Sequence, residues 1–195
     1  MNSRKILVYL PSPLGDAVLC TPALRTIREK YSDASISFLA SSTVRQILSP
    51  CAFNDGWIDS GGNLLKLACK IRREKFTDAL LFKNSFSAAV TVFLAGIKNR
   101  IGYRRDGRGF MLTEKIEPLK KADGKFAVLS MVDYYLKIAE VIGCDTSKRR
   151  LELAVDVADV NSACEKVPEV CAIEPVVILV PGGAFGLSNC WPAER

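Results

Sequence analysis

The stretch Ile6–Tyr31, ILVYLPSPLGDAVLCTPALRTIREKY, decides the fold, because an apolar run stops at a Pro/Gly loop and a helix follows. Ile6–Leu10 is five consecutive apolar residues with β-branched members, which predicts a short buried strand. Ser12–Gly15 is then the turn, and Thr21 before Pro22 is typical of a helix start. In open α/β sheets such a junction lies at the carboxyl end of a strand, where ligands bind.

Asp16 is the ionisable group of this loop, and two interpretations of it are open. It is either an N-cap or first-turn carboxylate that stabilises the helix, or a catalytic base. The stretch is not a nucleotide-binding fingerprint, because it has one glycine where the dinucleotide motif needs three and lacks the Gly-Lys-Ser/Thr of a P-loop.

Apolar strands and amphipathic helices alternate through the first two thirds of the chain. Strands are expected at 36–40, 57–58, 79–82 and 100–103, and helices at 42–48, 61–73, 88–95 and 126–142. Asn84 and Ser85 can cap the helix that starts near Ala88. This β-α-β-α alternation predicts an α/β fold with a doubly wound, mostly parallel, Rossmann-like sheet.

The last third of the sequence starts a second unit of the same kind. A linking strand is expected at Leu151–Val155, a short helix at Val160–Val167 and a buried strand at Val176–Val180 that runs into Pro-Gly-Gly. We therefore expect two domains, residues 1–150 and residues 151–195, of which the second is only the first strand and loop of a Rossmann-like domain.

Composition is that of a soluble globular protein, with 49% hydrophobic and 25% charged residues in 195. The first apolar run is too short for a signal peptide, and the longest, Ala88–Ile97, is far below the ~20 residues of a membrane span. These features favour a cytoplasmic location.

The cysteine and histidine content limits which catalytic groups the chain can supply. Seven scattered cysteines without a C-x-x-C pair favour reduced thiols, and no metal site is expected. The chain has no histidine, which removes Ser-His-Asp and Cys-His nucleophile pairs. A general base must be a carboxylate or, as the weaker alternative, Lys, Tyr or Cys.

The net charge of +6 and the pI of about 9.0 indicate an anionic partner. Three arginines, Arg104, Arg105 and Arg108, surround Asp106 in the loop Tyr103–Thr113, YRRDGRGFMLT. The loop is either a solvated turn or an anion-binding rim, since arginine forks match carboxylate and phosphate groups.

Three segments together resemble the lipopolysaccharide core heptosyltransferases of glycosyltransferase family 9. They are PLGDAVLCTPALR (13–25), KNSFSAAVTVFLAGIKNRIGYRRDGRGFMLT (83–113) and PGGAFGLSNCWPAER (181–195), in the family's order and spacing. The resemblance implies a GT-B fold, with an acceptor-binding N-terminal domain and a C-terminal domain that binds the donor, ADP-heptose. This chain would hold the first domain and only the beginning of the second, and we expect it to be inactive alone.

The resemblance also implies roles for particular residues. Asp16, in the family's Gly-Asp motif, would be the general base of an inverting transfer. The acceptor is the inner core of lipopolysaccharide, built on Kdo and lipid A, and would be bound by Gly15, Asn84, Ser85, Arg104, Arg105 and Arg108. Peripheral contact with the cytoplasmic face of the inner membrane is expected, and no cofactor is expected beside the donor substrate.

Gly182, Gly183 and Asn189 would contact the donor. Where relatives usually carry Gly-Pro-Ala-Lys-Arg-Trp-Pro, this chain has GLSNCWP (186–192), so that Asn189 replaces a lysine. A neutral amide cannot offset the charge of the leaving pyrophosphate as an ammonium does.

A non-catalytic nucleotide or nucleic-acid binding module is the alternative function. Against nucleic acid, the basic residues gather in a loop and not along a recognition helix, and no interleaving of aromatic and basic residues is present.

Overall fold

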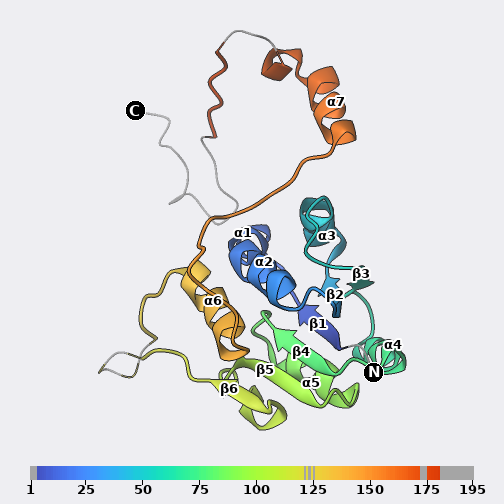
Figure 1. Cartoon of the computed structure of the whole chain (residues 1–195), viewed down its shortest axis with the longest axis vertical. Helices are drawn as coiled ribbons and strands as arrows, with labels where there is room; N and C mark the ends of the chain where they lie inside the picture. Colours follow the sequence, from blue (N-terminus) through green and yellow to red (C-terminus); the bar gives the residue numbers. More distant parts are fainter. Residues whose placement is uncertain (1–3, 121, 123, 125, 172–174, 181–195) are drawn as a thin grey trace. The chain divides into compact units, whose positions relative to one another are not determined.

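The structure, a computed structural model, describes residues 4–120, 122, 124, 126–171 and 175–180 (Figure 1). The chain divides into two units, Met1–Ala154 and Val155–Arg195, and each is described by itself. The predicted division into an acceptor domain and an incomplete donor domain stays a prediction.

The first unit is built on a parallel sheet whose strand order is β3-β2-β1-β4-β5-β6 (Figure 1). The strands are β1 (Lys5–Tyr9), β2 (Ser35–Ala40), β3 (Gly56–Asp59), β4 (Asp78–Leu81), β5 (Asn99–Tyr103) and β6 (Glu114–Ile116). This is the strand order of the Rossmann fold, and it confirms the predicted doubly wound parallel sheet.

Helices connect the strands of this sheet, and one more, α6, follows the last strand. They are α1 (Leu14–Leu19), α2 (Thr21–Lys30), α3 (Ser42–Leu48), α4 (Leu64–Glu74), α5 (Phe86–Leu94) and α6 (Met131–Val141), with a 3-10 turn η1 (Arg108–Met111). Ser41, Asn63 and Ser85 each accept a hydrogen bond from the first turn of the helix that follows, so these side chains fix where α3, α4 and α5 begin.

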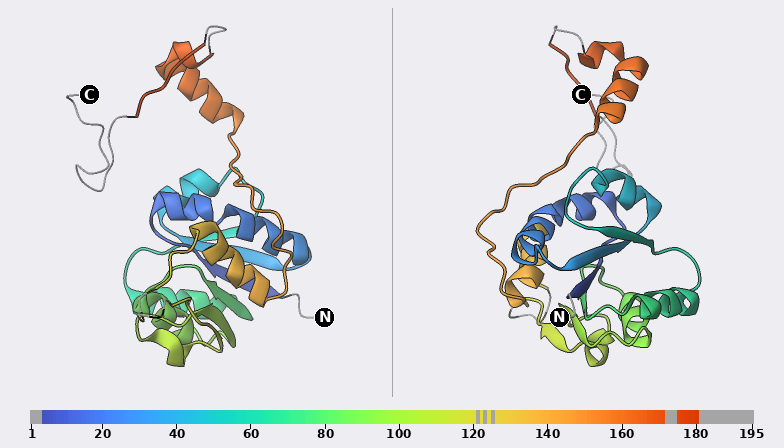
Figure 2. Two further views of the ribbon diagram at one scale, coloured as in Figure 1. Left: turned by 90° about the vertical axis from the view of Figure 1, so that its left-hand side faces the viewer. Right: turned by 45° about the vertical axis from the view of Figure 1, so that its right-hand side comes forward.

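The sheet is buried on both faces, and alternate residues of β1 show this. Ile6 and Val8 pack in a core with α1, α2, α3 and α6, whereas Leu7 and Tyr9 pack in a second core with α4, α5 and η1. Figure 2 shows α1, α2 and α6, in blue and gold, across the sheet from α4 and α5, in green. Continuous apolar runs are the sequence mark of such doubly covered strands.

A buried carboxylate holds the amino end of the sheet. Asp78, at the start of β4, accepts hydrogen bonds from Arg4 Nε (2.9 Å) and Arg4 Nη2 (2.7 Å). Thr77 Oγ1 (2.6 Å) and Asn99 Nδ2 (3.1 Å) also donate to it. Burial opposes ionisation, but the hydrogen bonds from Arg4, Thr77 and Asn99 lower the pKa of Asp78 below its usual value. The carboxylate thus joins the beginnings of β1, β4 and β5.

The first loop differs from the prediction. The helix α1 begins at Leu14, inside the expected turn, with Pro13 as its N-cap residue. Cys20 separates α1 from α2, and the Thr21 hydroxyl donates to the carbonyl oxygen of Val18 instead of capping α2. One and a half turns of helix are too short to produce a recognisable period, so the sequence could not reveal α1.

The helix expected at 126–142 is shorter than predicted, because α6 begins at Met131. Phe126 pairs with Lys120 in an antiparallel bridge, and Ala127 N donates to the carbonyl oxygen of Leu119 (2.9 Å). These bonds use backbone groups of residues 126 and 127 that a helix would have required.

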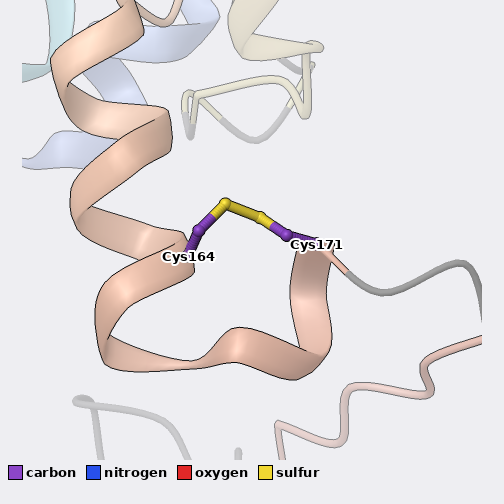
Figure 3. Close-up of a disulfide and its surroundings, with 2 residues drawn as sticks. All are labelled: Cys164 and Cys171. Carbon is purple, nitrogen blue, oxygen red and sulfur yellow. A yellow bond between two sulfur atoms is a disulfide. The ribbon is translucent and has the colours of Figure 1, made fainter.

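The second unit contains α7 (Val157–Lys166) and a 3-10 turn η2 (Pro168–Cys171). A disulfide joins Cys164 to Cys171, so the expectation that all cysteines are reduced is wrong for this pair (Figure 3). The two Cα atoms are 5.6 Å apart because the chain reverses after α7, and this separation suits a disulfide. Sequence spacing alone could not show this reversal.

Two predicted strands are absent from the described residues. Residues 151–155 and 176–180 are not in any strand, and Val177–Val180 are 73–82% exposed. An apolar run forms a strand only where a neighbouring strand accepts its backbone hydrogen bonds, and none pairs with these residues here. In the described part of the chain, no helix is long and apolar enough to cross a membrane.

Candidate functional site

The candidate site lies at the carboxyl edge of the sheet, between β1 and β4. These two strands are neighbours, and the chain runs outward from them in opposite directions, to β2 and β3 on one side and to β5 and β6 on the other. This is the topological switch point, at which open α/β sheets form their ligand crevice.

Hydrogen bonds tie together the two loops at the switch point. Phe82 N and Lys83 N both donate to the carbonyl oxygen of Tyr9, at 3.0 and 2.9 Å. The Lys83 ammonium donates to Ser12 Oγ (3.0 Å) and lies 5.4 Å from the centroid of the Tyr9 ring. The loop after β1 is therefore held against the loop after β4.

Asp16 occupies the first turn of α1 and is half-buried. Its carboxylate does not cap the helix, and it accepts no hydrogen bond from any described residue. Burial raises the pKa of Asp16 above its usual value. Burial also raises the pKa of Cys20 and of Tyr135, and the Asp16 charge adds to both rises. The N-cap interpretation is therefore wrong. Asp16 is a carboxylate in the first turn of the helix, and its oxygens can still accept hydrogen bonds.

Gly15, beside Asp16, leaves room at the edge of the sheet. Apart from its chain neighbours and the backbone of its own helix, no atom lies within 4 Å of the position that a Cβ would occupy there. Gly15 is exposed, so a ligand can approach the start of α1 along its backbone.

The sequence led us to expect Arg108 on an exposed rim. The structure shows instead that Arg108 is fully buried (0% exposed). Its guanidinium donates to the carbonyl oxygens of Tyr103 (3.0 Å) and Lys83 (2.6 Å) and to Asn84 Oδ1 (2.7 Å). A third carbonyl, that of Ser85, lies 3.4 Å from Nη1. Arg108 thus uses its donors to hold the β4–α5 loop, because loop carbonyls inside the protein need partners.

Asn84 and Ser85 lie at this loop as predicted, but part of each side chain is already used. Asn84 accepts from Arg108, and Ser85 Oγ accepts from Ala88 N as the N-cap of α5. The amide nitrogen of Asn84 and the Ser85 hydroxyl hydrogen keep donor capacity for a ligand.

Arg104 and Arg105 are the rim arginines that remain accessible. Arg104 is exposed and pairs with Glu117 (3.0 Å), and Arg105 is half-buried, 3.4 Å from Asp106. With Lys115 they line a shallow depression of about 500 Å³. Lys115 was missed because β6, which carries it, is three residues long and two of these are exposed.

Three buried tyrosines, Tyr103, Tyr134 and Tyr135, contact one another beside this loop, and sequence reasoning missed them. The rings of Tyr103 and Tyr134 stack at 3.8 Å, and the Tyr103 hydroxyl donates to the carbonyl oxygen of Tyr134 (2.8 Å). Burial raises the pKa of Tyr103, Tyr134 and Tyr135, so all three phenols stay protonated. In the sequence they were indistinguishable from core aromatic residues.

Burial raises the pKa of Tyr135; the Asp16 charge adds to this rise, and the Arg105 charge opposes it. Gly182, Gly183 and Asn189 lie outside the described residues, so the predicted donor contacts are not part of this site. Among the described residues, no group of three or more carboxylate, cysteine or histidine side chains is placed to hold a metal ion.

The strand order and the polar groups gathered at the switch point define a Rossmann-like domain with its ligand site at the carboxyl edge of the sheet. Residues 64–195 match the sequence profile of glycosyltransferase family 9 (heptosyltransferase), and the chain belongs to this family.

The names of similar proteins agree with this family assignment. Lipopolysaccharide heptosyltransferase 2 of Escherichia coli K12 is 28% identical over 204 residues, which cover 96% of this chain and 57% of that protein. Lipooligosaccharide heptosyltransferase 2 of Haemophilus influenzae is 24% identical, again over 96% of this chain and 57% of the relative. The chain thus spans little more than half the length of these relatives.

Solved structures share the fold. The Escherichia coli ADP-heptose lipopolysaccharide heptosyltransferase II superposes with a TM-score of 0.69 at 25% identity, over 96% of this chain and 57% of that one. A family 9 glycosyltransferase of Veillonella parvula gives a TM-score of 0.73 at 18% identity, over 88% of this chain and 50% of that one.

Proposed function

We propose that this chain supplies the acceptor-binding domain and the general base of an inverting heptosyltransferase. The enzyme would transfer heptose from ADP-heptose to the inner core of lipopolysaccharide. The observation that carries the proposal is the half-buried Asp16 carboxylate, which has no hydrogen-bond donor among the described residues and lies at the switch point of a family 9 fold.

Asp16 suits the role of base for a chemical reason. Burial raises its pKa, which makes the carboxylate a stronger proton acceptor than an exposed aspartate. In the reaction, Asp16 takes the proton of the acceptor hydroxyl as that oxygen bonds to the anomeric carbon of heptose. The bond from this carbon to the ADP oxygen breaks on the opposite face, and ADP leaves with the electron pair.

The basic depression supports recognition of an anionic acceptor. Arg104, Arg105 and Lys115 line it, and guanidinium forks bind carboxylates and phosphates such as those of Kdo and lipid A. Arg108 contributes indirectly, since it holds Asn84 and the carbonyls of the β4–α5 loop. In this proposal Arg108 is a positioning residue.

A cytoplasmic enzyme that touches the inner membrane peripherally would match this acceptor. Support comes from Phe110, which is 72% exposed and lines the basic depression. Its ring lies 6.4 Å from that of Phe86, which is also exposed. Aromatic rings beside cations favour the interface of an anionic bilayer.

The test of Asp16 uses a protein that joins this chain to the carboxyl-terminal half of the Escherichia coli relative. Release of ADP is followed with ADP-heptose and an inner-core acceptor. In Asp16→Asn we expect turnover to fall by about 10²–10⁴, because the amide cannot accept the proton. Asp159→Asn, a first-turn aspartate of α7, is the matched control and should retain turnover. Equal turnover in wild type and Asp16→Asn, with both proteins folded by circular dichroism, would remove Asp16 as the base.

A further inference from the structure

Helix α1, which carries Asp16, is held only weakly by its own residues. Within the described part of the chain it is six residues long, has no side-chain hydrogen bond at its N-cap residue Pro13, and fully buries only Ala17. Helices shorter than about 12 residues are marginal on their own, so contacts with the rest of the protein determine where α1 lies. At its amino end, Lys83 provides one such contact by donating to Ser12 Oγ (3.0 Å).

The carboxyl end of α1 depends on Thr21. The carbonyl oxygen of Val18 lies in the last turn of α1, and the residue four positions later, whose N–H would normally bond to it, is Pro22, which has no N–H. The Thr21 hydroxyl supplies the missing donor, 2.8 Å from Val18 O. Thr21 is fully buried (0% exposed), so its hydroxyl takes the place that bulk water cannot fill.

The same hydroxyl is also an acceptor, and its donor comes from far along the chain. Glu152 N donates to Thr21 Oγ1 at 3.0 Å. A hydroxyl has one hydrogen to donate and lone pairs to accept with, so Thr21 can make both bonds at once. The backbone of residue 152 is thereby connected to α1 through a single buried side chain.

Glu152 ends a segment, residues 143–152, that we call the strap. Its residues are all described and lie in no helix or strand. At its start, Lys30 Nζ in the last turn of α2 donates to Gly143 O (2.6 Å). At its end, Glu152 meets Thr21 in the first turn of α2, so the strap runs along α2 from its carboxyl end to its amino end.

Arg25, in the middle of α2, fastens the end of the strap. Its Nη1 donates to the Glu152 carboxylate (2.8 Å) and to Arg150 O (3.2 Å), and its Nη2 donates to Lys148 O (3.3 Å). The Arg25 side chain is only 17% exposed, which shields these bonds from water. Arg25 therefore holds Glu152 where its N–H can reach Thr21.

We propose that Thr21 is a positioning residue for Asp16, and that the strap fixes helix α1 through it. The strap closes the first unit, which ends at Ala154, so the hydrogen bonds of Thr21 connect the last part of this unit with the helix that carries the carboxylate. The inference rests on the proposed function for its meaning in transfer, since it explains how the base is held, but its test does not require transfer.

The test is made by NMR on this chain, without substrates. The amide protons of Ala17 and Cys20 report on the two ends of α1, because they bond to Pro13 O (3.0 Å) and Asp16 O (3.1 Å). Thr21→Val keeps the branched shape of the side chain and removes the hydroxyl, so Val18 O and Glu152 N lose their partner. We expect both amide protons to exchange about tenfold faster or more.

Titration of the Asp16 carboxyl carbon gives the second measurement. Burial raises the pKa of Asp16, so a loosened α1 in Thr21→Val should lower the measured pKa toward that of an exposed aspartate. Burial also raises the pKa of Cys20 and of Tyr135, which respond to the Asp16 charge, so both stay protonated while Asp16 titrates. The change in pKa therefore reports the surroundings of Asp16 itself.

Two threonine variants are the controls. Thr21→Ser keeps the hydroxyl and should restore amide exchange in α1 and the pKa of Asp16 to values near those of wild type. Thr91 is another buried threonine (2% exposed), whose hydroxyl donates to Ser87 O (2.8 Å) inside α5. Thr91→Val is therefore the matched substitution on the other side of the sheet, and it should change neither measurement.

Arg25→Gln tests the strap, because it leaves Thr21 in place and removes the donors that hold the end of the strap. Amide exchange in α1 should become about threefold faster or more. Added to Thr21→Val, Arg25→Gln should cause no further change in α1, since both act through the bond from Glu152 to Thr21. Glu29→Gln removes only the exposed pair of Glu29 with Lys148 (3.3 Å) and should change nothing in α1.

Unchanged amide exchange and an unchanged Asp16 pKa in a folded Thr21→Val protein would overturn the positioning role. Equal changes in Thr91→Val would also overturn it, because they would report a general loss of stability. No effect of Arg25→Gln on α1, or an effect that adds in full to that of Thr21→Val, would remove the strap from the inference. Equal turnover in wild type and Asp16→Asn would instead remove the base and leave the role of Thr21 in holding α1 intact.

Discussion

A single guanidinium, that of Arg108, fixes the geometry of the loop that carries Asn84 and Ser85. The three arginines of this loop looked equivalent in the sequence. In the structure Arg108 supports the loop, Arg104 pairs with Glu117 at the surface, and Arg105 lines a cavity beside α6. The backbone decides this: Asp106 and Gly107 both adopt positive φ (54° and 72°), and the reversal turns Arg108 inward. A charge pattern shows that cations are present but not which of them faces the interior, so the site could be predicted only in part.

The Arg108 interpretation predicts a large loss of stability on substitution. Arg108→Gln removes a buried charge and leaves several loop carbonyls without donors, so we expect unfolding to become easier by about 3 kcal/mol or more. Arg104→Gln removes an exposed ion pair and should cost only about 0–1 kcal/mol. Urea denaturation of the two variants checks this; equal midpoints would show that Arg108 is not the support of the loop.

Among the strands and helices, those with continuous apolar runs or clear caps were predictable. β1, β2 and β4 are buried on both faces, and α3 was predicted at its observed bounds, Ser42–Leu48. The failures have local physical causes. β6 is too short and too exposed for a pattern, and the apolar run 176–180 has no ladder partner among the described residues. The apolar pattern of a sequence indicates which residues are buried, whereas strand pairing depends on whether another strand lies alongside.

The carboxylate at the amino end of the sheet gives a pH-dependent prediction. The pKa of Asp78 is lower in the folded than in the unfolded protein, so its ionised carboxylate stabilises the fold. This contribution to the free energy of unfolding is fully present above the ordinary aspartate pKa of about 3.9 and is lost as pH falls through the lower pKa of the folded protein. Asp78→Ala leaves the donors of Thr77 and Asn99 without their acceptor and should therefore reduce stability by about 1–3 kcal/mol at neutral pH, and the difference from wild type should shrink in acid.

Thermal unfolding of wild type and Asp78→Ala across acidic and neutral pH measures this difference. Asp59→Ala, at the end of β3, is the control. It should reduce stability only slightly, and this reduction should not change with pH as that of Asp78→Ala does. A stability difference for Asp78→Ala that is constant from neutral pH into strong acid would contradict the assignment.

Across the complete chain, the two units differ in how they are held together. The first has two apolar cores on either side of a sheet, whereas the described helix α7 of the second has no buried residue. The disulfide between Cys164 and Cys171 is the covalent constraint on that helix and the turn after it. Neither fact was readable from the sequence, because burial and the approach of two cysteines both depend on the path of the chain.

Reduction should consequently act on the second unit alone. In the chain-entropy account, a loop of this size contributes about 2 kcal/mol, so reduced protein or Cys164→Ser should show faster amide exchange over residues 157–171. Exchange in β1 and β4 should not change. Hydrogen exchange with mass spectrometry measures both regions, and Cys69→Ser, an exposed free cysteine, is the control. Equal exchange over 157–171 before and after reduction would show that the bond adds no constraint there.

The central position of β1 also affects how the chain is made. β1 is synthesised before both of the strands that it pairs with, β2 on one edge and β4 on the other, through pairs such as Ile6 with Asp78. At about 5–20 residues per second, β2 follows within seconds, but the stretch up to β4 takes about 4–15 s longer than β1 itself to be synthesised. During that interval one edge of this doubly covered strand stays open in the nascent chain, so the demand for chaperones should fall once Leu81 has emerged.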